Sequence, residues 1–341
     1  MKKVLTLGLI AALSAVVCIS CGPQPGTTGS TAEEALLRLL PKETRGLVMV
    51  DVHKAMTTEA VAKALKDENT SKKYDALVQS LGIDPAKDIS AFAIAFMDKT
   101  PGSPAPNGAA VINLKYGKDS LLGKLREDIK SLHEETYSGF TIYKKTDAKG
   151  ATASIEWAFL DDADIAVGSG PAIRSILDIR QKNAGSVLQN SAMAKIIKSA
   201  DKSAVCWAAF IVPPGLVSKI AEQSPMAKVF EGVTALSASF DYRNSSLIVE
   251  IRTMGGTKDE NRRLATTLDG LRVMGASLVE KEPALKDLLN GIEITSGAED
   301  VKFKAVIPQA ALEKLQKAAQ DKFGSKFILK PPETPPVKEI K

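Results

Sequence analysis

Leu236-Ser237-Ala238-Ser239-Phe240-Asp241-Tyr242 is the first arm of the clearest hairpin pattern in the chain. After a turn at Arg243-Asn244-Ser245, the second arm is Leu247-Ile248-Val249-Glu250-Ile251-Arg252. In both arms apolar side chains recur at every second position. A period of two places alternate side chains on opposite faces of a strand. Two such runs joined by a short polar turn are typical of an antiparallel hairpin, here with one apolar and one mostly polar face.

The segments after this hairpin also carry helix and strand signals. Thr257 and Glu260 form a capping box, which favours a helix start. The helix it opens carries an apolar stripe made of Leu264, Leu268, Leu271, Met274 and Leu278. A second hairpin is expected from residues 292–295 and 301–307, and Pro308 is expected to start a last helix.

The first half of the chain also mixes strands with helices. Period-two or continuous apolar runs predict strands, and apolar residues three and four apart predict helices. The expected strands are 47–52, 91–96, 109–114, 140–143, 154–160 and 165–167, and the expected helices are 31–40, 58–65, 72–81, 119–132 and one that begins at Gly170. The predicted class is therefore α+β, with antiparallel-rich sheets backed by helices.

The order of expected strands and helices starts again after Gly185, which predicts two lobes of similar size. The expected organisation is a signal peptide at 1–20, a flexible tether at 21–31, lobes at 32–184 and 185–328, and a proline-rich tail at 329–341. Strand, Asp-containing turn, strand, glycine and helix occur in that order at 158–179 and again at 236–268. This order raises the alternative that the lobes are duplicates, with these two stretches as counterparts.

Composition excludes several classes of function. The chain is 44% hydrophobic and 25% charged, which is ordinary for a globular protein. Without the first 20 residues it has 43 basic and 40 acidic residues, because Lys2 and Lys3 leave with the signal. This near balance gives no basic patch for nucleic acid. Aromatic residues make up only 5%, which argues against an aromatic platform for carbohydrate.

The residues that could carry chemistry do not form a recognisable set. Cys206 lies in an apolar run and is expected to be a buried structural thiol. His53 and His133 lie in different elements without partners at metal-ligand spacing, so no metal, cofactor or catalytic residue is assigned. His53 is expected to end a strand on the same face as Asp51.

Two short motifs have both a functional and a plain interpretation. Asp161-Asp162-Ala163-Asp164 offers carboxylates to a hard cation but lacks the spacing of a calcium loop, so a solvated turn is favoured. Gly168-Ser169-Gly170 precedes a helix and could bind an anion, although a turn and cap is favoured. The Phe92, Ile94 and Phe96 ladder, beside an all-alanine face, could line an apolar cavity or be plain core.

The N-terminus carries the pattern of a targeting signal. Lys2 and Lys3 precede the uncharged apolar stretch 4–17, and Cys18-Ile19-Ser20-Cys21 is followed by helix-breaking Gly22-Pro23. A positive start, a short apolar stretch and a small residue before the cut are typical of a signal peptide. The pattern resembles the lipobox of bacterial lipoproteins, in which cleavage after the small residue, here Ser20, leaves a cysteine, here Cys21, that receives a diacylglyceryl group and fatty acids such as palmitate. The alternative is ordinary secretion with an unmodified Cys21 thiol.

The resemblance implies a protein held to the cell envelope by its lipid. Two or more acyl chains hold a protein stably to a membrane. Gly22 stands where an Asp often signals retention in the inner membrane, so the periplasmic face of the outer membrane is expected where the organism has one. The expected function is a non-catalytic binding or structural module that contacts other envelope proteins. The alternative is a periplasmic carrier of a hydrophobic or lipid ligand.

Overall fold

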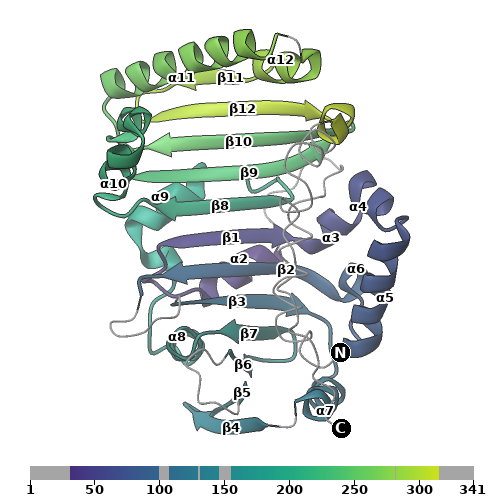
Figure 1. Ribbon diagram of the computed structural model, residues 1–341. Helices are drawn as coiled ribbons and strands as arrows, with labels where there is room; N and C mark the ends of the chain where they lie inside the picture. The colour runs from purple at the N-terminus through teal and green to yellow at the C-terminus, as the bar shows by residue number, and fades with distance from the viewer. Residues whose placement is uncertain (1–30, 100–106, 130, 146–154, 281, 315–341) are drawn as a thin grey trace, which may run out of the picture.

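A computed structural model describes residues 31–99, 107–129, 131–145, 155–280 and 282–314. It contains one antiparallel sheet of twelve strands with helices on both faces (Figure 1). The expected α+β class with antiparallel strands is confirmed.

The strands follow the chain in two groups. The first half contributes β1 (Gly46–Asp51), β2 (Ile89–Met97), β3 (Asn107–Leu114), β4 (Leu132–Tyr137), β5 (Phe140–Lys145), β6 (Glu156–Phe159) and β7 (Asp164–Gly168). The second half contributes β8 (Cys206–Ile211), β9 (Ala235–Arg243), β10 (Ser246–Met254), β11 (Glu293–Ser296) and β12 (Asp300–Pro308).

The described helices lie between and before these strands. Those of the first half are α2 (Thr31–Leu39), α3 (Val52–Met56), α4 (Glu59–Ala64), α5 (Glu68–Leu81), α6 (Pro85–Asp88), α7 (Lys118–Asp128) and α8 (Gly170–Arg180). Those of the second half are the 3-10 helix η1 (Val187–Gln189), α9 (Ser191–Ser199), α10 (Leu216–Gln223), the 3-10 helix η2 (Pro225–Phe230), α11 (Lys258–Leu278) and α12 (Pro283–Asn290). Residues 309–314 are also helical.

The expected boundary near residue 185 falls between two contiguous halves of one sheet. The strand order is β11-β12-β10-β9-β8-β1-β2-β3-β7-β6-β5-β4, so the halves meet where β8 pairs antiparallel with β1. One hydrophobic core crosses this junction, since Leu47 and Met49 of β1 pack in the same cluster as Trp207 and Ala209 of β8.

The two halves repeat the same topology. Going outward from β1 the neighbours are β2, β3, β7 and β6, and going outward from β8 they are β9, β10, β12 and β11. The helix before the central strand is repeated too, because α9 and β8 each begin 160 residues after α2 and β1, at 191 against 31 and at 206 against 46. The hairpin β4–β5 extends the first half only.

The register of the central pair is symmetric as well. Gly46 of β1 pairs with Phe210, and its counterpart Cys206 pairs with Val50, the counterpart of Phe210. The antiparallel central pair then acts as a pseudo-twofold axis normal to the sheet. This topology corrects the expected correspondence between 158–179 and 236–268: β6, β7 and α8 match β11, β12 and the helix after them, whereas β9–β10 matches β2–β3.

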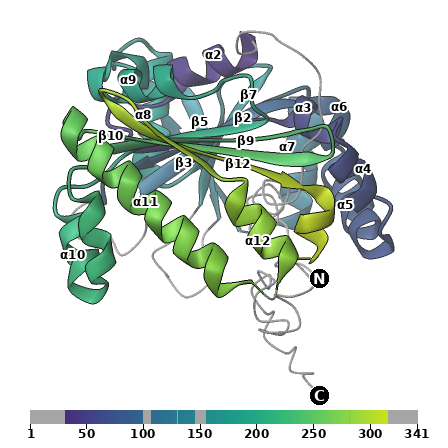
Figure 2. The same cartoon turned by 90° about the horizontal axis from the view of Figure 1, so that it is seen from above.

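The two faces of the sheet differ in side-chain size. On the alanine face, which we define by Ala91, Ala93, Ala95, Ala109, Ala158, Ala166 and Ala209, small side chains let helices approach closely. Helices α2, α8 and α9 pack there (Figure 2). Their buried residues include Leu36, Ile173, Ile176 and Ile196.

Two local expectations from the sequence are wrong. The helix expected at 119–132 ends at Asp128, and Leu132 starts β4, whose register with β5 is set by the pair Tyr137 and Phe140. The strand expected at 47–52 ends at Asp51, because the Asp51 carboxylate accepts a hydrogen bond from the Lys54 backbone N–H at 2.8 Å and caps α3. His53 therefore lies in a helix and is exposed.

Candidate binding face

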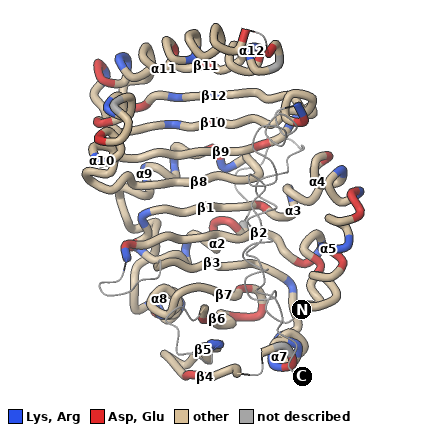
Figure 3. Tube along the Cα trace, viewed as in Figure 1, with Lys and Arg blue, Asp and Glu red and all other residues tan. Residues whose placement is uncertain are grey.

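The opposite face of the sheet is the strongest candidate for a binding surface. We call it the aromatic face, and define it by the residues of nine neighbouring strands that alternate with the alanine face: Val301, Phe303, Ala305, Ile307; Leu247, Val249, Ile251, Thr253; Leu236, Ala238, Phe240, Tyr242; Cys206, Ala208, Phe210; Gly46, Val48, Val50; Phe92, Ile94, Phe96; Gly108, Ala110, Ile112, Leu114; Ile165, Val167; Trp157 and Phe159. In these described strands the set contains no charged side chain. Figure 3 likewise shows the middle of β8, β1, β2 and β3 without Lys, Arg, Asp or Glu.

The aromatic face is buried at one end and half-open in the middle. Phe92 and Ile112 are covered where α3 to α7 pack on the sheet. In contrast, Ile94, Phe210 and Phe240 are only half-buried, and Phe96 is 43% exposed. The sequence left open whether the Phe92, Ile94 and Phe96 ladder is core or cavity lining, and the structure shows that it passes from core to open surface along one strand.

A glycine makes room for an aromatic ring on this face, at the start of β1. Gly46 of β1 lies between Phe96 and Phe210, whose ring centroids are 6.3 Å apart. A Cβ on Gly46 would lie 2.4 Å from Phe210 Cδ1, so a side chain here would push the ring away.

Helices form a rim around the open part. α10, α11 and α12 lie on the aromatic side of the sheet, with α10 at one end of the strands and α3 to α6 at the other (Figures 1 and 2). The apolar stripe of α11 starts on the protein and then leaves it: Leu264 is 6% exposed, whereas Met274 is 54% and Leu278 80% exposed. The stripe expected from sequence is therefore only partly packed, because α11 runs diagonally off the sheet (Figure 2).

A surface hollow of about 480 Å³ lies where β1 begins and β8 ends. Its lining combines the ion pair of Arg45 with Asp98, at 3.0 Å, with the backbone of 211–215 and the hydroxyl-bearing Ser218 and Thr234. The hollow is open and mixed in polarity, and its neighbours in sequence are Gly46 and Phe210 of the aromatic face.

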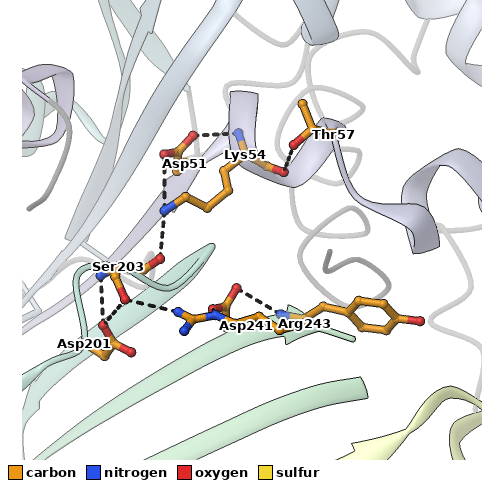
Figure 4. Close-up of polar contacts among 8 residues, drawn as sticks. Asp51, Lys54, Thr57, Asp201, Ser203, Asp241 and Arg243 are labelled. Atoms are coloured by element: carbon orange, nitrogen blue, oxygen red, sulfur yellow. Dashed lines mark hydrogen bonds and ion pairs between the residues drawn. The ribbon is translucent and has the colours of Figure 1, made fainter. Parts of the chain in front are cut away.

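A polar cluster lies on the opposite, alanine side, at the end of β1 and β9 (Figure 4). Lys54 Nζ donates to the Ser203 carbonyl at 2.8 Å and lies 3.8 Å from Asp51 Oδ2. Arg243 donates to Ser203 Oγ at 3.2 Å and pairs with Asp241. These contacts join α3, the loop before β8 and the end of β9, so each of these side chains holds neighbouring segments together.

Glu33 is the one carboxyl in this region with a strongly altered ionisation. It is 3% exposed, and it occupies the position in α2 that Met193 occupies in α9. Burial and, second, the charge of Asp51 raise the pKa of Glu33 to about 7. Lys54, a hydrogen bond from the Trp207 indole and Lys202 act in the opposite direction. Sequence reasoning did not single out Glu33, because its unusual position becomes clear only from the duplicated topology. The other half has an apolar side chain, Met193, at the corresponding position.

The acidic turn at 161–164 is held by the protein's own donors. Asp161 Oδ1 accepts the backbone N–H groups of Ala163 and Asp164, both at 2.8 Å, and Oδ2 pairs with Arg180 at 2.7 Å. Burial raises the pKa of Asp164, whose carboxylate accepts a hydrogen bond from Asn113 at 2.8 Å. Across the described residues no group of three or more His, Cys, Asp or Glu side chains could hold a metal ion.

Gly170, the first residue of α8, faces a protein carboxylate. A Cβ on Gly170 would lie 2.7 Å from Glu156 Oε1, and Arg174 pairs with the same carboxylate at 3.1 Å. Ser169 Oγ donates to Asn107 at 2.8 Å and makes no cap to the helix. Glu156 therefore occupies the place where an external anion would meet this helix start.

The structure does not bring the remaining candidate residues together. His53 lies in α3 and His133 in the edge strand β4, and both are exposed. The strands β2 and β3 lie between Asp51 on β1 and Asp164 on β7. Cys206 is buried on the aromatic face, as expected, and forms no disulfide. The expected cleavage and lipidation residues, Ser20 and Cys21, and the tail at 329–341 lie outside the described residues.

None of the helices in the described part of the chain combines the length and hydropathy required to span a bilayer.

Comparison with known proteins finds similarity to solved structures at low sequence identity. No protein-family model matches the chain, and no curated protein matches it. Among solved structures, crystal form III of TP0453 is similar with a TM-score of 0.48 at 9% identity, covering 86% of this chain and 100% of that one. Crystal form I of TP0453 gives 0.47 at 8% identity, covering 83% and 96%, and form IV gives 0.45 at 9%, covering 84% and 99%.

Proposed function

We propose that this protein is a lipid-anchored binding module of the cell envelope that acts without catalysis, and that the aromatic face is its binding surface. The observation that carries the proposal is the uncharged face of nine strands, which stays half-open in the middle. Soluble monomers seldom expose large contiguous apolar patches, and such patches mark sites for partners or ligands. Covering apolar surface contributes about 25 cal/mol per Å².

The anchor part of the proposal rests on the N-terminal pattern. Cys21 would carry the lipid, and residues 22–30 would form a short tether, rich in Gly, Pro, Thr and Ser, to α2, the first described helix, which begins at Thr31. A tether of this length keeps the binding face within a few tens of ångströms of the membrane surface.

The rim favours a narrow occupant. Because α10, α11 and α12 lie on the same side as the aromatic face, a second flat sheet would meet these helices before it reached the strands at the centre of the sheet (Figure 2). An occupant narrower than a sheet, such as a hydrocarbon chain or a single peptide segment, would avoid this contact. This observation favours the second candidate function, a carrier of a hydrophobic or lipid ligand.

The binding surface is tested with N-phenyl-1-naphthylamine, an uncharged dye whose fluorescence rises in apolar sites. Phe96 and Val306 are both 43% exposed, but Val306 points to the other face, since its neighbours Ala305 and Ile307 belong to the aromatic face. Phe96→Asp should weaken dye binding at least about tenfold, because a carboxylate disfavours an apolar ligand. Val306→Asp is the matched control and should leave the affinity within about twofold. Equal affinity of both variants and the parent chain would contradict the proposal.

The carrier alternative has its own measurement. Mass spectrometry of an organic extract of protein purified from envelopes should detect a stoichiometric lipid if the chain is a carrier, and the lipid should be lost in Phe96→Asp. A clean extract together with saturable dye binding supports the binding module and rejects the carrier.

A further inference from the structure

The surface hollow at the start of β1 lies at one end of the aromatic face. Val212 and Thr234, which line it, continue the pairing of β8 with β9, because the Val212 backbone N–H donates to the Thr234 carbonyl at 2.8 Å. By the alternation of a strand, these two residues belong to the same side of the sheet as Phe210 and Leu236. The hollow therefore adjoins the half-open part of the aromatic face, where Phe210 stacks on Phe96.

The two ends of this half-open part differ in polarity. At the far end, where α3 to α6 pack on the sheet, Phe92 is buried in an apolar cluster. At the near end, the described lining of the hollow includes the exposed charged residues Arg45, Asp98 and Glu231. A ligand with a hydrocarbon chain at one end and a charged head at the other matches this order of surfaces.

Hydrocarbon matches the half-open part better than an extended peptide does. The strands β1, β2, β8 and β9 pair with one another, so their backbone N–H and C=O groups are used within the sheet. A peptide laid on this face would bring backbone N–H and C=O groups that meet only apolar side chains, and burying unpaired polar groups costs free energy. An acyl chain has no such groups.

The charges of the hollow select the head. Arg45 Nε pairs with Asp98 at 3.0 Å, and the terminal nitrogens of a guanidinium carry further N–H donors that can bind a phosphate. In the described lining, the carboxylates of Asp98 and Glu231 outnumber this cation, so a head that is only anionic would be repelled. A head that carries an ammonium beside its phosphate has a partner for each charge. Ser218 and Thr234 add hydroxyl groups that can donate to ester oxygens.

We propose that the hollow binds the zwitterionic head of a phospholipid of the phosphatidylethanolamine class, whose acyl chains lie on the aromatic face. The phosphate would lie at Arg45, and the ammonium would lie at Asp98 and Glu231. This inference rests on the proposed function, because it names the class of ligand for the aromatic face and adds a site for its head. The volume of the hollow, about 480 Å³, is in the usual range of small-molecule sites.

Displacement of N-phenyl-1-naphthylamine by short-chain lipids tests the choice of head. Monomeric dihexanoylphosphatidylethanolamine should bind at least about tenfold more tightly than dihexanoylphosphatidylglycerol, which has the phosphate without the ammonium. Phosphoethanolamine alone, followed by calorimetry, should bind far more weakly, because it has no chains to bury. Equal affinities for the two lipids would overturn the assignment of the head. A free head that binds as tightly as the lipid would overturn the lipid as the ligand.

Substitutions in the hollow test the same assignment from the protein side. Arg45→Gln should weaken binding of dihexanoylphosphatidylethanolamine at least about tenfold and leave the affinity for the uncharged dye within about twofold. Arg38→Gln is the matched control, since Arg38 also forms an exposed ion pair, with Glu34 on α2, and exposed pairs contribute little to stability. Glu231→Gln should bring the affinities for the two lipids closer together. Equal lipid affinities in Arg45→Gln and Arg38→Gln would contradict the proposal.

Phe96→Asp separates this inference from the proposed function. If Phe96→Asp weakens dye binding but Arg45→Gln leaves lipid binding unchanged, the aromatic face stands as the binding surface and the head site is rejected. If lipid binding depends on Arg45 but neither dye nor lipid binding responds to Phe96→Asp, the head site stands and the proposed function is rejected. Loss of lipid binding in both variants supports the two together.

Discussion

Replacing Glu33 should stabilise the protein at neutral and alkaline pH. The carboxyl is buried in α2 near Asp51, and burial together with the Asp51 charge raises its pKa from the ordinary 4.5 to about 7. A difference of about 2.5 in pKa corresponds to about 3 kcal/mol between the two protonation states. Above pH 7 the folded protein therefore carries a buried charge that costs up to about 3 kcal/mol of unfolding free energy.

The pH dependence follows from the sign of the change. Because the folded pKa lies above the unfolded one, the folded state binds more protons between pH 4.5 and 7, and stability falls as the pH rises through that window. Below pH 4.5 the carboxyl is neutral in both states, and the penalty is absent. Glu33→Gln removes the titration, and Glu33→Met copies Met193 of the other half.

Urea unfolding at pH 4.5, 6 and 8 provides the assay. The difference between Glu33→Gln and the parent chain should be small at pH 4.5 and grow to about 2–3 kcal/mol in favour of the variant at pH 8. Glu34→Gln is the control on the same helix, since Glu34 is exposed and forms a surface pair with Arg38 that contributes at most about 1 kcal/mol. A stability difference for Glu33→Gln that does not change between pH 4.5 and 8 would refute the reasoning.

Two other changes test the packing at the binding face and the anchor. Gly46→Ala should destabilise the fold by about 1–3 kcal/mol in urea unfolding, because its Cβ would lie 2.4 Å from the Phe210 ring. Gly123→Ala on α7, where a Cβ meets nothing within 4 Å, should stabilise it by up to about 1 kcal/mol, and equal effects at the two glycines would contradict the packing argument. Cys21→Ser should move the protein from the detergent phase to the aqueous phase when envelopes are partitioned, and mass spectrometry of the parent chain should find an acylated N-terminal cysteine. An unmodified cysteine at position 21 in released protein would contradict the anchor.

Local patterns in the sequence predicted much of the sheet. The hairpin β9–β10 has the expected turn, with Asn244 and Ser245 at φ of 52° and 53°, as a tight two-residue turn requires. The capping box of Thr257 and Glu260 is present at the start of α11. Each of these signals lies within a few residues of the element it defines, so one sequence was sufficient.

Features that depend on distant contacts were not predictable in the same way. Strand β4 carries Glu134 and Glu135 on a polar edge, so no apolar alternation marks it. The counterparts in the duplication share topology with little residue identity, so the sequence alone paired the wrong segments. The aromatic face emerges only when nine strands stand side by side, since each contributes no more than three or four apolar residues to it.

The central claim is that ligands meet this protein on the aromatic face. The most direct measurement is photolabelling of the purified protein with an uncharged apolar diazirine, followed by mapping of the labelled peptides by mass spectrometry. Labels should concentrate on β1, β2, β8 and β9, around Val48, Phe96 and Phe240. Labels confined to the exposed residues Ile220 of α10 and Leu278 of α11, with those strands unlabelled, would contradict it.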